Sequence, residues 1–92
     1  VDRVLSEVSR SFGVTVEDIL SKKRDAEVCL ARHTSIYILR ESTQIKMKEI
    51  GKEIGGRDHA TVIHSIKEVE RLKRDDSKYA EILADIRDNV IN

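Results

Sequence analysis

A short polar cluster suited to recognising another molecule lies at residues 58–61. Asp58 supplies a carboxylate that accepts hydrogen bonds, and His59 supplies an imidazole that donates or accepts them. Ala60 and Thr61 place methyl groups beside these polar atoms. Such groups match the edges of DNA bases, because a carboxylate accepts from the cytosine amino group and a methyl group contacts the thymine methyl. The cluster therefore indicates recognition of bases.

The flanking residues predict that this cluster opens a helix. Gly55 and Gly56 favour a tight turn, because glycine reaches backbone conformations that a side chain forbids. Asp58 then occupies an N-cap position, where its carboxylate accepts from the unpaired amides of the first turn. Apolar residues recur at helical spacing over 62–69. A shorter amphipathic helix, from Lys46 to about Ile54, precedes the turn, and this order is typical of a helix-turn-helix.

The rest of the chain also predicts helices. An apolar stripe runs from Val1 to Phe12 and ends at Gly13, after which Thr15 caps a short second helix. A third helix is expected from about Leu30 to Ser42, with Tyr37 on its surface. The helix after the turn should extend from His59 to about Lys73. A capping hinge at 75–77 then leads into a last amphipathic helix. The predicted fold class is all-α: a compact, Trp-repressor-like bundle of about six helices containing the helix-turn-helix.

Length and composition fit one small domain over residues 1–92. The sequence begins at Val1, without methionine, and we expect it to be an excised part of a longer protein. No run of about 18 apolar residues is present, so no membrane span is expected. A single cysteine excludes an internal disulfide and suits a reducing cytoplasm.

Charge is balanced overall but unevenly distributed. The chain has 17 basic and 17 acidic residues, yet residues 21–74 hold thirteen Lys and Arg against eight Asp and Glu. Both ends are acidic in excess. A basic middle segment can face phosphates while the remaining surface stays neutral or acidic.

Several motifs resemble one known family. The stretch GGRDHATVIH is similar to GGRDHTTVxH, and further similarity covers Phe12–Arg24, Arg32, Arg40–Thr43 and Lys48–His59. These motifs resemble the C-terminal domain of the DnaA family of bacterial chromosomal replication initiators. The similarity extends over essentially the whole chain, so it is more specific than a lone helix-turn-helix pattern.

The resemblance implies binding to short, A·T-containing asymmetric boxes in double-stranded origin DNA, and a cytoplasmic, nucleoid-associated protein. Other initiator copies and ATP are implied only through domains of the full-length family protein. The resemblance places an arginine in the minor groove at Arg24, where a narrow A·T groove attracts it. The expected base contacts are Arg24, Lys48, Asp58, His59, Ala60 and Thr61. The expected phosphate contacts are Arg32, His33, Arg40, Lys46, Met47, His64 and Lys67.

The chain departs from the family pattern at three places. Ala60 replaces the usual threonine, which keeps a methyl group and removes the hydroxyl. Lys48 stands where relatives commonly carry proline, which adds an amide and a charge. Ala26 occupies a position that is often basic, between Asp25 and Glu27.

Other chemistries have little support in the residues. Cys29 and His33 are spaced as a helical ligand pair, but structural zinc sites take four ligands, so no metal is expected. No phosphate-binding loop of the GxxxxGK[ST] type is present, so neither ATP binding nor enzyme activity is expected of these residues. Arg57 either contacts phosphate or braces the turn through a carboxylate such as Glu53 or Asp58.

Two alternatives to the origin-binding hypothesis remain at this stage. The same fold serves transcription regulators and transposase-linked proteins, and fold alone does not separate them. A helical protein-interaction module would use its apolar stripes on a partner and bind DNA weakly. The combination of the Arg24 loop with the GGRDH motif favours origin binding.

Overall fold

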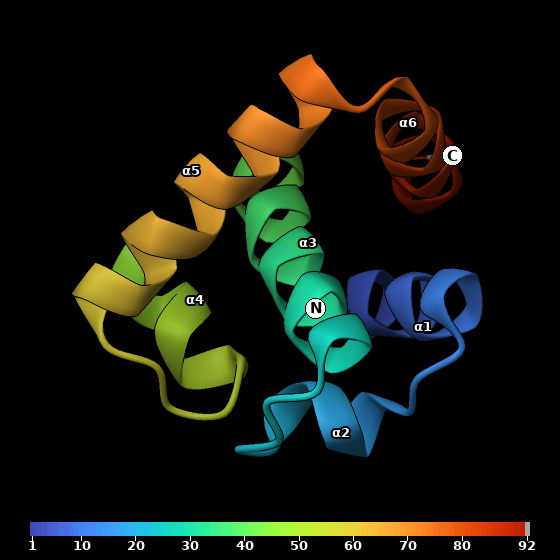
Figure 1. The fold of residues 1–92 in the computed structure, drawn as a ribbon. Helices are drawn as coiled ribbons and strands as arrows, with labels where there is room; N and C mark the ends of the chain where they lie inside the picture. The colour runs from blue at the N-terminus through green and yellow to red at the C-terminus, as the bar shows by residue number, and fades with distance from the viewer. Residues whose placement is uncertain (92) are drawn as a thin grey trace.

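One central helix organises the chain in a computed structural model that describes residues 1–91. Within these residues the helices are α1 (Asp2–Phe12), α2 (Val16–Leu20), α3 (Ala26–Ser42), α4 (Met47–Glu53), α5 (His59–Asp75) and α6 (Ser77–Ile91), with no strand. Figure 1 shows α3 in the middle of the bundle, and α3 packs against each of the other five helices. The predicted all-α bundle of about six helices is confirmed.

The helix boundaries follow from local capping chemistry. Gly13 ends α1 with a left-handed φ of 67°, which a residue with a side chain adopts at a cost. The Thr15 hydroxyl accepts from the Asp18 amide at 2.9 Å and so caps α2. At the start of α6, a carboxylate oxygen of Asp76 accepts from the Tyr79 amide at 3.1 Å. The predicted stops and caps at these positions are confirmed.

Two predictions about α3 were wrong, one about where it begins and one about which of its residues is exposed. The helix begins at Ala26, one turn earlier than expected, although the Asp25 side chain makes no capping bond to it. Tyr37, predicted on the surface, is 5% exposed. Burial explains the second difference: neighbouring helices cover the middle of α3 on all sides, so Tyr37 lacks the solvent-facing side that an amphipathic pattern assumes.

Polar side chains inside the bundle are paired. The Thr34 hydroxyl donates to the Leu30 carbonyl at 2.8 Å, so the Tyr79 hydroxyl is the donor in its 2.7 Å bond to Thr34. Burial raises the pKa of Tyr79 to about 12, which keeps this proton in place at neutral pH. This bond ties α6 to α3.

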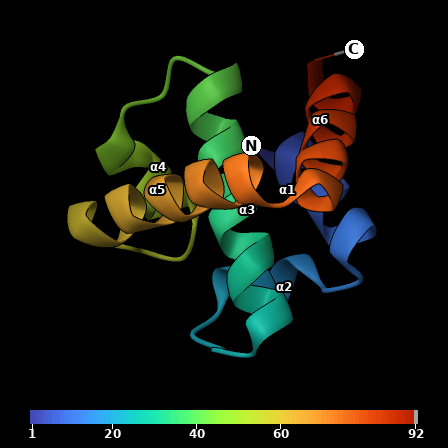
Figure 2. The ribbon, with the colours of Figure 1, turned by 45° about the horizontal axis from the view of Figure 1, so that its top comes forward.

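The apolar faces of the outer helices meet around α3 to form one core. Figure 2 shows α5 running across α3, with α1 and α6 at one side and α4 at the other. The core includes Val4, Leu5, Val8, Ile19, Ala31, Ile36, Ile38, Leu39, Ile50, Ile54, Val62, Ile66, Val69, Leu83 and Ile86. Within residues 1–91, no helix has the length and apolar character that a membrane crossing requires.

The corner between α4 and α5 is packed backbone to backbone. The Arg57 amide donates to the Gly51 carbonyl at 2.8 Å. A Cβ atom on Gly51 would lie 2.2 Å from the Arg57 carbonyl oxygen, a distance that real Cβ atoms do not tolerate. The close helix packing predicted at Gly51 is therefore confirmed, and the glycine fixes how tightly the chain turns.

We expect Gly51→Ala to destabilise the domain, although alanine is the better helix former. The added methyl group would force the turn away from α4, and overpacking of this kind costs about 1–3 kcal/mol. Urea unfolding followed by circular dichroism measures the change. Glu53→Ala, at an exposed position of the same helix, is the control and should shift the midpoint little. A midpoint for Gly51→Ala at or above that of the wild type would contradict this account.

Candidate nucleic-acid interface

The glycine turn between α4 and α5 sets the angle of the helix-turn-helix. Gly55 and Gly56 have φ values of 74° and 76°, in the left-handed region that favours glycine. A Cβ atom on Gly55 would lie 2.2 Å from the Leu20 carbonyl oxygen. The turn therefore lies directly against the end of α2, which is distant in sequence.

The first turn of α5 presents the polar cluster to solvent. A carboxylate oxygen of Asp58 accepts from the Thr61 amide at 2.8 Å, which confirms the predicted N-cap. Hydrogen bonding from Thr61 lowers the pKa of this carboxyl, so Asp58 is an anion at neutral pH. His59, Ala60 and Thr61 are exposed. The helix tip is thus held by its cap while its outward groups stay free to meet a ligand.

The basic loop between α2 and α3 presents Arg24. Its side chain is exposed, and within the described residues it takes part in no hydrogen bond or ion pair. Lys23 instead lies 3.3 Å from an Asp18 carboxylate oxygen. Arg24 and the likewise exposed Lys22 are therefore the cations of this loop that can reach outward.

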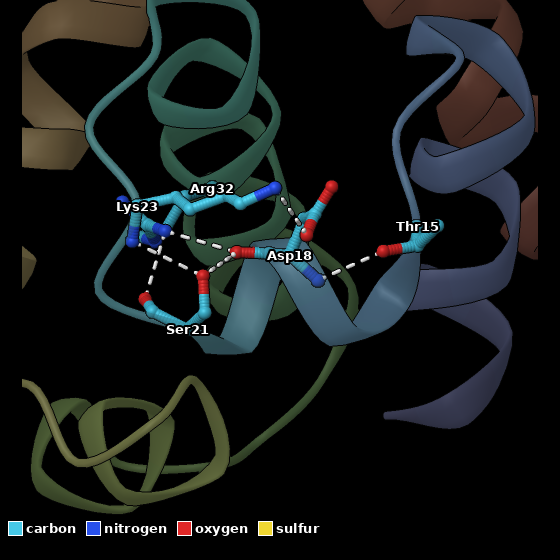
Figure 3. Close-up of polar contacts among 5 residues, drawn as sticks. All are labelled: Thr15, Asp18, Ser21, Lys23 and Arg32. Atoms are coloured by element: carbon cyan, nitrogen blue, oxygen red, sulfur yellow. Dashed lines mark hydrogen bonds and ion pairs between the residues drawn. The ribbon is translucent and has the colours of Figure 1, made fainter.

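Arg32, predicted as a phosphate contact, has a different role in the structure. It is 6% exposed, and Figure 3 shows its side chain reaching back to the end of α2. Its Nε donates to the Ile19 carbonyl at 2.8 Å, and one Nη donates to the carbonyls of Asp18 and Ser21 at 3.1 and 2.9 Å. Because these carbonyls occupy its donors, Arg32 is an internal support of the basic loop.

The basic loop and the α5 tip border one open groove of about 750 Å³. Figure 1 shows the α2–α3 loop and the α4–α5 turn at the same lower edge of the molecule. Two segments separated in sequence thus share one face of the molecule. The polar and basic lining includes Lys22, Arg24, His33, Arg57, Asp58, Thr61, His64 and Ser65, with Ala60 among them.

His59 lies on the other side of the α5 tip. It lines a smaller hollow of about 400 Å³ together with Lys48 and Lys52, which follow one another by four residues on α4. Asp58 borders both hollows. The N-terminus of α5 therefore stands between two recesses, each with basic side chains in its wall.

A histidine pair joins α3 to α5 in the wall of the groove. His33 is half-buried, and its Nδ1 shares a 2.7 Å hydrogen bond with the Ser65 hydroxyl. The His33 and His64 rings meet edge to face with centroids 5.7 Å apart. Burial lowers the pKa of His33, with a smaller contribution from His64, so His33 is neutral at pH 7. His33 therefore offers a hydrogen bond at this face, without a positive charge.

The other predicted phosphate contacts fall into two groups. The first group is His64 and Lys67 on α5. Ala60 and His64 line the groove, and the spacing of four and three residues from Ala60 to His64 to Lys67 puts Lys67 on the same face of the helix. Arg40, Lys46 and Met47 come from the junction of α3 and α4.

Within this junction group, Arg40 and Lys46 are exposed. The Met47 side chain packs against the core, and Met47 is the first residue of α4, where backbone amides lack helical partners. The group of Met47 that can contact a phosphate is therefore its backbone amide.

Sequence reasoning missed two residues of this face, Lys22 and Ser65. Lys22 lines the groove beside Arg24, and the run of basic residues at 22–24 was the available signal. Ser65 is buried against His33, for which the sequence holds no signal. For Arg57, phosphate contact and a brace of the turn through a carboxylate were both left open, and in the structure its guanidinium braces the turn through backbone carbonyls.

Comparison with known proteins places this geometry in a family. Residues 1–69 match the family model described as "Bacterial dnaA protein helix-turn-helix". The match includes the basic loop, the glycine turn and the first part of α5.

Individual relatives agree with the family match. The chain is 38% identical over 81 residues to the chromosomal replication initiator protein DnaA of Anaplasma marginale, covering 88% of this chain and 17% of that protein. Against the protein of the same name from Streptococcus thermophilus (strain ATCC BAA-491 / LMD-9), identity is 41% over 83 residues, covering 89% and 18%. The match to that of Rippkaea orientalis is 31% over 87 residues, covering 95% and 19%.

The chain spans less than a fifth of the length of these relatives. Their similarity to it nevertheless runs through the helix-turn-helix and the residues that precede it. By this match and by its fold, the chain belongs to the bacterial DnaA helix-turn-helix family, as its DNA-binding domain.

Proposed function

We propose that this domain binds short, A·T-containing boxes in double-stranded DNA at a chromosomal replication origin. The observation that carries the proposal is the shared groove, in which the basic loop and the α5 tip face the same side of the molecule. A recognition helix entering the major groove leaves the adjacent minor groove within reach of a neighbouring basic segment. The relatives are named as chromosomal replication initiators, which supports the origin as the target.

In the proposed complex, the two segments read different grooves. Asp58, His59, Ala60 and Thr61 contact base edges in the major groove from the first turn of α5, and Lys48 reaches them from α4. Arg24 enters the minor groove, whose negative potential is strongest where A·T pairs narrow it. Because Ala60 carries a methyl group and no hydroxyl, its contact is apolar and favours a thymine methyl.

The proposed phosphate contacts hold this register. They are His33, Arg40, Lys46, Met47, His64 and Lys67. Phosphate contacts orient a protein on the duplex without carrying sequence information. The charges of Arg40, Lys46 and Lys67 make affinity depend steeply on salt, because each charged contact releases condensed counterions.

The proposal includes the wider setting. Residues 1–92 form one domain of a longer initiator that acts on the chromosome with other copies of itself, in the cytoplasm and on the nucleoid. The coverage of the relatives by this chain supports a longer protein. Footprinting this domain on origin DNA would identify the matched box. Titration of that duplex and a scrambled duplex at two salt concentrations then tests specificity, and equal affinity for both would contradict the proposal.

We expect Arg24→Ala and His59→Ala each to weaken binding to the matched box by about 1–3 kcal/mol, and binding to scrambled DNA much less. Each side chain is exposed and is assigned to a base edge, so its loss removes sequence discrimination. Fluorescence anisotropy with both duplexes measures the effect. Lys78→Ala, which removes one charge from α6, is the control. Equal losses on both duplexes would make these residues phosphate anchors.

Lys67→Ala should weaken all duplexes alike. Lys67 is exposed on the face of α5 that carries His64, and a lost phosphate contact reduces the slope of log affinity against log salt by about one unit. Binding isotherms over a salt series give this slope. A slope equal to that of the wild type would remove Lys67 from the interface.

A further inference from the structure

The Arg57 guanidinium makes hydrogen bonds that link segments distant in sequence. Its Nη1 donates to the Leu20 carbonyl at 3.3 Å, to the Ile54 carbonyl at 3.1 Å and to the Gly55 carbonyl at 3.3 Å. Its Nη2 donates to the Ser21 carbonyl. The contacts to Leu20 and Ser21 cross 37 and 36 residues of sequence. One side chain therefore joins the glycine turn to the last residues of α2.

The Ser21 carbonyl is also an acceptor for Arg32, whose Nη2 donates to it at 2.9 Å. Guanidinium groups from α3 and from the turn thus converge on one oxygen at the start of the basic loop. The last carbonyls of any helix lack partners within it, and cations are favourable at that end. In this chain α2 has only five residues, too few to be stable alone. Arg32 and Arg57 supply hydrogen-bond donors and positive charge to the carbonyls at the end of α2.

We propose that Arg57 is a positioning residue: it fixes the basic loop at a set distance from α5, so that Arg24 and the helix tip fit one duplex together. Arg24 follows Ser21 by three residues, so the anchored carbonyl sets where the loop begins. The inference rests on the proposed function, because it concerns two segments that read the same DNA. It differs from phosphate contact, in which the Arg57 donors would point to solvent.

Burial supports this assignment. Arg57 is half-buried, and burial lowers the pKa of its guanidinium, which nevertheless stays protonated at neutral pH. The four carbonyl oxygens occupy both of its terminal nitrogens. A backbone contact joins the same two segments: a Cβ atom on Gly55 would find no room beside the Leu20 carbonyl. Turn and loop are therefore in contact through backbone and side chain alike.

A double-mutant cycle between Arg57 and Arg24 tests the inference. Arg57→Lys keeps the charge and removes the planar fork that reaches several carbonyls at once. We expect it to lower affinity for the matched box by about tenfold, with little change on scrambled DNA or in the salt slope. In the Arg24→Ala background the same change should cost less than about twofold, because Arg24 is then no longer there to be placed. Equal losses in both backgrounds would overturn the proposal.

A readout on the wild-type protein covers the case in which Arg57→Lys does not fold. The guanidinium N–H signals of Arg57, observed by NMR, should be slow to exchange in the free domain and shift little when the matched duplex is added. Protection that appears only with DNA would identify a phosphate contact and contradict the inference. Wild-type discrimination between matched and scrambled duplexes is measured beside it. Equal affinity of the wild-type domain for both duplexes would refute the proposed function. The exchange of the Arg57 signals in the free domain would still test whether Arg57 is held by the carbonyls of α2 and the glycine turn.

Discussion

The arrangement of the interface depends on the backbone carbonyls at the end of α2. A five-residue helix leaves these oxygens without helical partners, and intrinsic propensity contributes at most a few tenths of a kcal/mol for each residue. Hydrogen bonds from charged donors contribute more, about 1.5–3 kcal/mol each. Arg32 and Arg57 provide such donors from two different elements. The junction therefore holds α2, α3 and the glycine turn together, and the surface that we propose for DNA contact is assembled around it.

This junction also shows how basic residues divide between interior and surface. The positive excess of residues 21–74 suggests a broad basic face, but Arg32 and Arg57 turn inward to carbonyls. Lys23 and Lys52 are paired with acids at the surface, where such pairs contribute little to stability. The set of cations available to a nucleic acid is thus smaller than composition indicates, and Arg24 belongs to it because its exposed side chain has no partner within residues 1–91.

Sequence reasoning succeeded where the determinants are local. The cap at Asp58, the stop at Gly13 and the close packing at Gly51 each follow from the residue itself and a few neighbours. It failed where partners are distant. The acceptors of Arg32 lie 11 to 14 residues away and those of Arg57 up to 37, and they are carbonyls, which every residue carries.

Burial of α3 is a second case of this limit. Tyr37 was expected at the surface of this helix, and it is buried instead. Only the full arrangement of five helices around α3 removes that surface. The family resemblance supplied the pairing of the Arg24 loop with the α5 tip, which spacing alone does not contain.

The two tight glycine contacts determine which positions near the turn can be substituted without moving the backbone. Gly51 and Gly55 each meet a carbonyl oxygen from another segment at a distance that excludes a methyl group, so neither position can drift without a matching backbone shift. His59 and Ala60 have no such constraint, since both are exposed and the Asp58 cap, not their side chains, holds the first turn. In the proposed complex, substitutions at these two positions can therefore change the preferred DNA sequence one residue at a time, without disturbing the backbone of the turn that presents them.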